Sequence, residues 1–180
     1  MSARTPSNDL ARSAVFWLRK GGELYHAMQT LLGHYEEQRR KRISGSALTP
    51  LDEANHNLLN QIHMLFGMAC ECWLKAALLA PETGFGLPFE TVVGKGHKLR
   101  ELAQECQLVL SERELEVLGF AEDSIAFFGR YPVDRHGRRM SHVSAGQPRG
   151  IFESIVVKIS DLLPSNLRQQ MIPRIYRREP

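Results

Sequence analysis

The stretch from Thr49 to Pro81 constrains the fold most, because it has the pattern of one long helix that is apolar on nearly every side. Thr49 is a suitable N-cap, Pro50 suits the first helical position, and Pro81 ends the helix. The apolar residues recur at helical spacing: Leu58, Ile62, Leu65, Ala69, Cys72, Ala76 and Leu79. Such a helix is normally surrounded by protein, so we expect it to form the centre of an all-α domain.

A narrow polar line interrupts this helix and consists of His63, Gly67, Glu71 and Lys75, each four residues apart. Glu71 and Lys75 stand in the favourable order for an i, i+4 ion pair. Burying both charges among apolar side chains costs free energy unless each finds a partner. Two interpretations remain open: a structural ion pair on a partly solvated seam, or one wall of a polar cleft between helices.

The composition is that of a globular protein without a disulfide framework or a cysteine zinc site. A length of 180 residues predicts one domain that is large enough to have a hydrophobic core. The net charge of +3 is too small to indicate nucleic-acid binding by itself. Cys70, Cys72 and Cys106 fit no disulfide framework or zinc spacing, so we expect reduced core thiols rather than a cysteine nucleophile. We expect no metal and no cofactor.

Two features predict a cytoplasmic protein that does not enter a membrane. The segment from Met1 to Asp9 is polar, and no clean apolar region follows it, so it does not have the pattern of a signal peptide. The central helix is long enough to span a membrane, but Glu71, Lys75 and its polar first half argue against that.

The segments before the central helix predict one further helix and a linker. Asn8 or Asp9 can cap a helix that runs towards Glu36, and Gly21-Gly22 is a point where it would kink or break. The basic run from Arg39 to Arg42 is then expected to lead into a solvated linker.

Three further helices are predicted after the central one, separated from it by a packed loop over residues 81–96. The first follows Gly96, the second begins at the capping box Ser111-Glu112-Arg113-Glu114, and the third runs from Ile151 to about Leu163. The residues expected to face inwards include Leu99, Leu102, Cys106, Leu115, Leu118, Ala121, Ile125, Phe128, Phe152, Ile155 and Ile159. The chain is therefore predicted to be an antiparallel helical bundle of four to five helices over residues 1–180, with a flexible N-terminus (1–7) and a basic C-terminal tail (165–180).

Short motifs follow in a characteristic order. The central helix reads G-M-A-C-E-C-W-L-K-A from Gly67 to Ala76, and it is followed by G-H-K-L-R-E-L-A from Gly96 and G-R-Y-P from Gly129. In this order and spacing the sequence resembles the HEPN superfamily of prokaryotic defence, abortive-infection and toxin-antitoxin systems. It looks closest to the branch with the GxxxExxLK, GHxL and GRYP motifs. The resemblance covers roughly Leu58 to Val133.

The resemblance implies a helical bundle that often forms a homodimer with a shared cleft. Many HEPN proteins are metal-independent endoribonucleases with an R-x(4-6)-H motif, in which the arginine binds the scissile phosphate and the histidine handles protons. Arg130 and His136, with five residues between them, match that motif as catalytic residues. RNA and a cognate antitoxin or other partner protein are the implied partners. The residues expected to bind or support are Glu71, Lys75, His97, Tyr131, Arg135, Arg138 and Arg139.

The same residues also allow a structural interpretation. Pro132 lies inside the motif, and Arg130 could pair with Glu71 across the bundle, which would leave His136 as an ordinary loop histidine. His97 could cap its helix or form a hydrogen bond with Glu71 instead of acting on a substrate. The chain would then be a non-catalytic helical module that binds a partner protein, a nucleotide or a nucleic acid.

Overall fold

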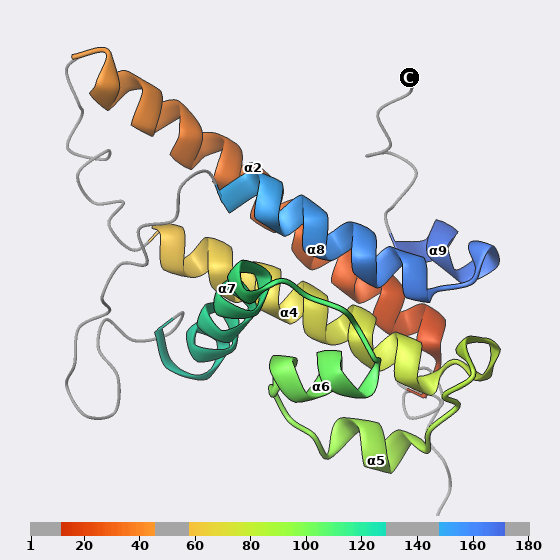
Figure 1. The fold of residues 1–180 in the computed structure, drawn as a ribbon. Helices are drawn as coiled ribbons and strands as arrows, with labels where there is room; N and C mark the ends of the chain where they lie inside the picture. Colours follow the sequence, from red (N-terminus) through yellow and green to blue (C-terminus); the bar gives the residue numbers. More distant parts are fainter. Residues whose placement is uncertain (1–11, 46–57, 129–147, 172–180) are drawn as a thin grey trace, which may run out of the picture.

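Helix α4 (Leu58–Leu79) lies at the centre of the computed structural model, which describes residues 12–45, 58–128 and 148–171. Every residue from Ala69 to Leu78 is buried, as expected for a helix enclosed by protein. Its main packing partner is α2 (Ala14–Ile43), which runs antiparallel to it (Figure 1). The predicted start of the central helix at Thr49 lies outside the described residues, whereas its end before Pro81 is confirmed.

Further helices cover α4 from two sides. Helix α8 (Pro148–Leu162) lies with α2 on one side, while α5 (Phe89–Val93) and α6 (Leu99–Glu105) lie on the other (Figure 1). Helix α7 (Glu112–Asp123) continues into the π-helical turn η3 (Ser124–Phe128), and both pack on α4. The 3₁₀ turn η2 (Pro81–Thr83) follows α4, and α9 (Ser165–Met171) packs on α2. The described residues contain no strand, so the predicted all-α helical bundle is confirmed.

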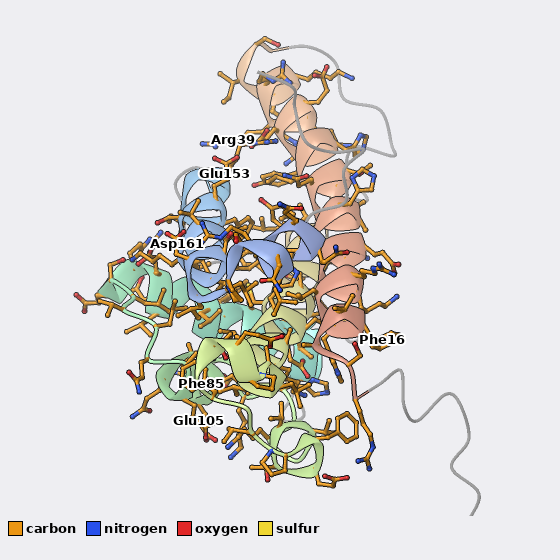
Figure 2. All side chains as sticks on the ribbon, turned by 90° about the vertical axis from the view of Figure 1, so that its right-hand side faces the viewer. Phe16, Arg39, Phe85, Glu105, Glu153 and Asp161 are labelled. Carbon is orange, nitrogen blue, oxygen red and sulfur yellow. The ribbon has the colours of Figure 1, made fainter. Side chains whose placement is uncertain are left out.

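Helix α2 differs from the sequence prediction in two places. The expected kink or break at Gly21-Gly22 is wrong, because α2 is one continuous helix. The helix also extends to Ile43, beyond its expected end near Glu36, so the basic run from Arg39 to Arg42 forms its last turns. These residues are exposed, as predicted for a solvated run, and their cations complement the negative end of the helix dipole. Figure 2 shows Phe16 pointing away from the bundle at the other end of α2, where it is 41% exposed.

The reason for Gly21 is the indole of Trp73, which packs directly on the α2 backbone. A Cβ at Gly21 would lie 2.4 Å from Trp73 Nε1, a distance that no side chain tolerates. The indole N–H donates to the carbonyl of Leu18 at 3.2 Å, so its polar atom is satisfied inside the core. Glycine at this position therefore permits the close approach of α2 and α4 and does not interrupt the helix.

Two segments that were predicted to be irregular contain short helices. Residues 81–96 include η2 and α5, with Val92 buried. The first part of the predicted basic tail over residues 165–180 is α9, which buries Leu167 and Met171, and the rest of that tail lies outside the described residues. The predicted flexible segment 1–7 also lies outside them.

The capping box at the start of α7 is confirmed, and it is part of a larger polar contact. The buried Glu114 carboxylate accepts hydrogen bonds from the Ser111 backbone N–H at 2.6 Å, Ser154 Oγ at 2.7 Å and Lys158 Nζ at 2.6 Å. Burial alone would raise the pKa of Glu114, but the bonds from Lys158, Ser154 and Ser111 lower it to about 2. Because Glu114 occupies the inner position of this turn, the prediction that Leu115 faces inwards is wrong, and its side chain is 42% exposed.

Helix α4 is also the one helix in the described part of the chain that has the length and apolarity to cross a membrane. In its most apolar window of 18 residues, 78% of the residues are buried inside the protein. The core helix of a folded domain can have the same length and apolarity as a membrane-spanning helix.

Two glycines of α2 provide a matched test of this packing. Gly21→Ala is expected to lower the free energy of unfolding by about 1–3 kcal/mol, because the new Cβ overlaps the Trp73 indole. Gly33→Ala is expected to raise it by about 0.5–1 kcal/mol, because a Cβ at Gly33 meets nothing within 4 Å and alanine favours the helix. Urea unfolding of both variants measures the difference. Equal effects of the two substitutions would contradict the proposed contact.

Candidate functional site

The polar line of α4 contains a buried ion pair. Lys75 Nζ lies 2.6 Å from Glu71 Oε1, and the two side chains are only 4% and 9% exposed. The predicted i, i+4 pairing of these residues is thus confirmed. The ammonium group of Lys75 also lies 5.5 Å from the centroid of the Trp17 ring on α2, within the range of a cation–π interaction. These contacts offset part of the cost of removing both charges from water.

The second oxygen of the same carboxylate contacts His97, which lies in the turn before α6. His97 Nδ1 is 2.7 Å from Glu71 Oε2, and the imidazole is 54% exposed. Of the two structural roles predicted for His97, the hydrogen bond with Glu71 is the one observed. We call Glu71, Lys75 and His97 the Glu71 cluster. It contains a buried carboxylate, a buried amine and an imidazole that is open to solvent.

The local sequence explains why His97 reaches α4. Gly96 has a φ of +61°, a left-handed conformation that glycine adopts without strain, and it turns the chain towards α6. Leu99 and Leu102 are fully buried and anchor α6 against the core. The imidazole is therefore held between a glycine turn and an anchored helix.

The start of α6 is also attached to the end of α7. The side chain of Lys98 makes no capping hydrogen bond at this helix start, and Glu122 on α7 acts instead: its Oε2 accepts the backbone N–H of Arg100 at 3.1 Å. The guanidinium group of Arg100 lies 3.6 Å from the other carboxylate oxygen of Glu122. The segment that begins with the GHxL motif thus contacts α4 through His97 and α7 through Arg100.

Gly67, the first residue of the GxxxExxLK motif, brings α4 close to α7. A Cβ at Gly67 would lie 3.0 Å from the carbonyl oxygen of Ala121 and 2.9 Å from Ile125 Cδ1. A larger residue would push η3 and the end of α7 away from α4. The GxxxExxLK and GHxL motifs meet at the contact between Glu71 and His97. The third begins directly after η3, outside the described residues.

Several predicted site residues cannot be placed relative to the Glu71 cluster, because they lie outside the described residues. These are Arg130, Tyr131, Arg135, His136, Arg138 and Arg139. Arg149, from the same basic segment, is described and lies in the first turn of α8. Its Nε and Nη2 donate to the two carboxylate oxygens of Glu36 on α2 at 3.0 and 2.8 Å. This bidentate pair attaches α8 to α2.

His63 belongs to the core and not to the Glu71 cluster. Its ring lies edge-on to Phe120 and Phe152, with centroid distances of 4.5 and 5.3 Å, and its Nδ1 is 2.7 Å from the carbonyl oxygen of Leu59. Burial lowers the pKa of His63 to about 4. His63 is therefore neutral at physiological pH, with the proton on Nδ1 donated to Leu59. Because His63 is enclosed in the core, the polar line of α4 does not form one continuous wall of a cleft.

The cysteines have the properties of core thiols. Cys70, Cys72 and Cys106 are free and buried, and burial raises the pKa of all three, to about 12 for Cys72 and Cys106. A thiolate nucleophile is therefore disfavoured at these positions. Among residues 12–45, 58–128 and 148–171, no group of three or more His, Cys, Asp or Glu side chains could hold a metal ion.

Two contacts of the site were not predicted from the sequence. The Trp17 ring lies over Lys75, and Glu122 accepts a hydrogen bond at the start of α6; both contacts join residues far apart in the chain, and no local pattern marks either pair.

No protein-family model, curated protein or solved structure matches the chain in the comparisons with known proteins.

The buried ion pair predicts a large effect of removing its cation. Lys75→Met should lower the free energy of unfolding by about 3 kcal/mol, the lower end expected for a broken buried pair, because His97 still contacts the Glu71 carboxylate. Lys98→Met removes an exposed pair with Glu101 and should change it by at most about 0.5 kcal/mol. Urea unfolding measures both, and similar values for the two lysines would contradict the account.

The neutral state of His63 predicts a loss of stability in acid. In the unfolded chain His63 has the ordinary histidine pKa of 6.5, whereas in the folded protein its pKa is about 4. The stability contributed by this site is full above pH 6.5 and falls as the pH drops towards 4, by about 3 kcal/mol in total. Urea unfolding at several pH values should show a weaker acid dependence for His63→Leu than for wild type. Parallel profiles would refute this assignment.

Proposed function

We propose that the protein is a HEPN-like, metal-independent endoribonuclease of a prokaryotic defence or toxin-antitoxin system. The observation that supports this proposal is the contact between Glu71 and His97, which joins two of the three motifs on which the resemblance depends. On this proposal the protein acts in the cytoplasm as a homodimer and has a cognate antitoxin or another partner protein.

The catalytic roles follow the resemblance. Arg130 holds the scissile phosphate, for which the two-pronged guanidinium group is suited, and His136 transfers a proton during attack by the 2′-hydroxyl. Arg135, Arg138 and Arg139 attract the RNA backbone. Glu122 attaches the start of α6 to the end of α7, the helix that leads through η3 towards the GRYP motif.

Incubation of the protein with RNA in the presence of EDTA tests this function. Wild type should cleave the RNA and leave 2′,3′-cyclic phosphate ends, because neither the attack by the 2′-hydroxyl nor its proton transfers need a metal. Arg130→Ala and His136→Ala should reduce the rate by about 10²–10⁴-fold. His142→Ala, a histidine of the same basic segment outside the motif, is the matched control and should retain activity. No cleavage under any condition would refute the proposal.

A second candidate function is a non-catalytic helical module that binds a partner protein, a nucleotide or a nucleic acid. It is favoured by the pairing within the Glu71 cluster, where both buried charges already have partners. If Arg130 completes that cluster structurally, Arg130→Ala lowers the melting temperature, while His136→Ala changes neither stability nor binding. Thermal melts of these two variants, together with the RNA assay, separate the two functions.

A further inference from the structure

We propose that the last turns of α2 bind the phosphate backbone of a nucleic-acid duplex without reading its sequence. The residues concerned are Arg39, Arg40, Lys41 and Arg42, which we call the basic end of α2. They lie outside the three motifs of the HEPN resemblance. The inference therefore goes beyond the proposed function and does not depend on it.

The basic end of α2 is open to solvent. Gln38 is still buried, at 4% exposure, whereas every residue from Arg39 to Gly45 is exposed. Figures 1 and 2 both show this end of α2 extending past the start of α8. The cationic side chains are therefore accessible to a large partner.

The cations of the basic end differ from the others in how they are paired. Elsewhere in the described part of the chain, every lysine and arginine but one has a carboxylate oxygen within 4 Å. Within the basic end, Arg40 lies 3.0 Å from Glu37. No carboxylate of the described residues lies within that range of Arg39 or Lys41. The basic end therefore carries an excess of positive charge.

The distribution of these cations fits a groove that is flanked by phosphates. Consecutive residues of an α-helix are about 100° apart, so four cations in a row point to all sides of the helix. The two strands of a duplex place phosphates on both sides of a groove, and lysines or arginines that neutralise them release condensed counterions. Binding of this kind is driven by charge and is independent of sequence.

A lipid surface or a protein partner fits this distribution less well. A helix that lies on a membrane has an apolar face opposite its cationic face. Ile43 is 76% exposed, but the four residues before it are all cationic, so no apolar face forms at this end of α2. The buried centre of a protein interface is likewise depleted of charged residues. A polyanion such as a nucleic acid is the partner that remains.

Fluorescence anisotropy of short labelled duplexes, measured in EDTA over a series of salt concentrations, tests the proposal. The main probe is DNA, because it has no 2′-hydroxyl and resists the proposed ribonuclease chemistry. An RNA duplex of the same sequence presents the same phosphates and shows which of the two binds more tightly. The double variant Arg39→Gln with Lys41→Gln should reduce the slope of log affinity against log salt by about 2, one for each lost phosphate contact.

The matched control is the double variant Lys20→Gln with Arg113→Gln. It also removes one lysine and one arginine, both exposed, but these are paired with Glu23 and Glu116. The net charge changes by the same amount, and the control should keep the wild-type slope. Thermal melts verify that both double variants are folded.

Three results would overturn the inference: no binding of either duplex by wild type, equal slopes for wild type and the basic-end variant, or an equal loss in the control. Vesicles that contain phosphatidylserine are the second probe. If the basic-end variant lost binding to vesicles but not to duplexes, the partner would be a lipid surface and the inference would be wrong. RNA cleavage is measured in a separate assay, so the proposed ribonuclease function can fail while this inference stands, and the reverse.

Discussion

The burial of the Glu71 carboxylate is the constraint on which the rest of the structure depends. Helix α4 is apolar on nearly every face, and a charge placed in its middle must find donors inside the protein. Lys75 supplies one donor from the next turn, and His97 supplies the other from a different segment. Because the second donor is not local, satisfying this one carboxylate also fixes where the chain before α6 meets α4.

Two glycines and the Trp73 indole allow the helices around α4 to pack closely against it. Gly21 accepts Trp73 on one side of α4, and Gly67 accepts the end of α7 on another. Glu122 then joins α7 to the start of α6, so that α4, α6 and α7 form a closed circuit of contacts around the Glu71 cluster. These contacts together hold the turn before α6 against α4, where His97 meets the Glu71 carboxylate.

The features that the sequence predicted well are local ones. The end of α4 at Pro81, the capping box at Ser111 and the pair of Glu71 with Lys75 each depend on residues within one helical turn. The errors have a common cause. The expected break at Gly21-Gly22 ignored Trp73, which lies 52 residues away in the chain, and the expected burial of Leu115 ignored the donors from α8 that turn Glu114 inwards. Tertiary contacts overrode local propensity at both places.

The candidate site was predicted in part for the same reason. The spacing of the central helix identified Glu71 and Lys75, but the sequence left the role of His97 open between a helix cap, a partner of Glu71 and a contact with substrate. Only the positions of α4 and α6 relative to each other decide between these roles. The contacts of Trp17 and Glu122 had no local signal at all, since neither residue belongs to a motif.

A double-mutant cycle between Glu71 and His97 tests most directly whether this carboxylate joins the two segments. The free energy of unfolding is measured for wild type, Glu71→Gln, His97→Gln and the double variant. We expect a coupling energy of about 1–3 kcal/mol, as for a hydrogen bond to a charged group. Effects that add to within about 0.5 kcal/mol would show that the two side chains act independently and would contradict the account.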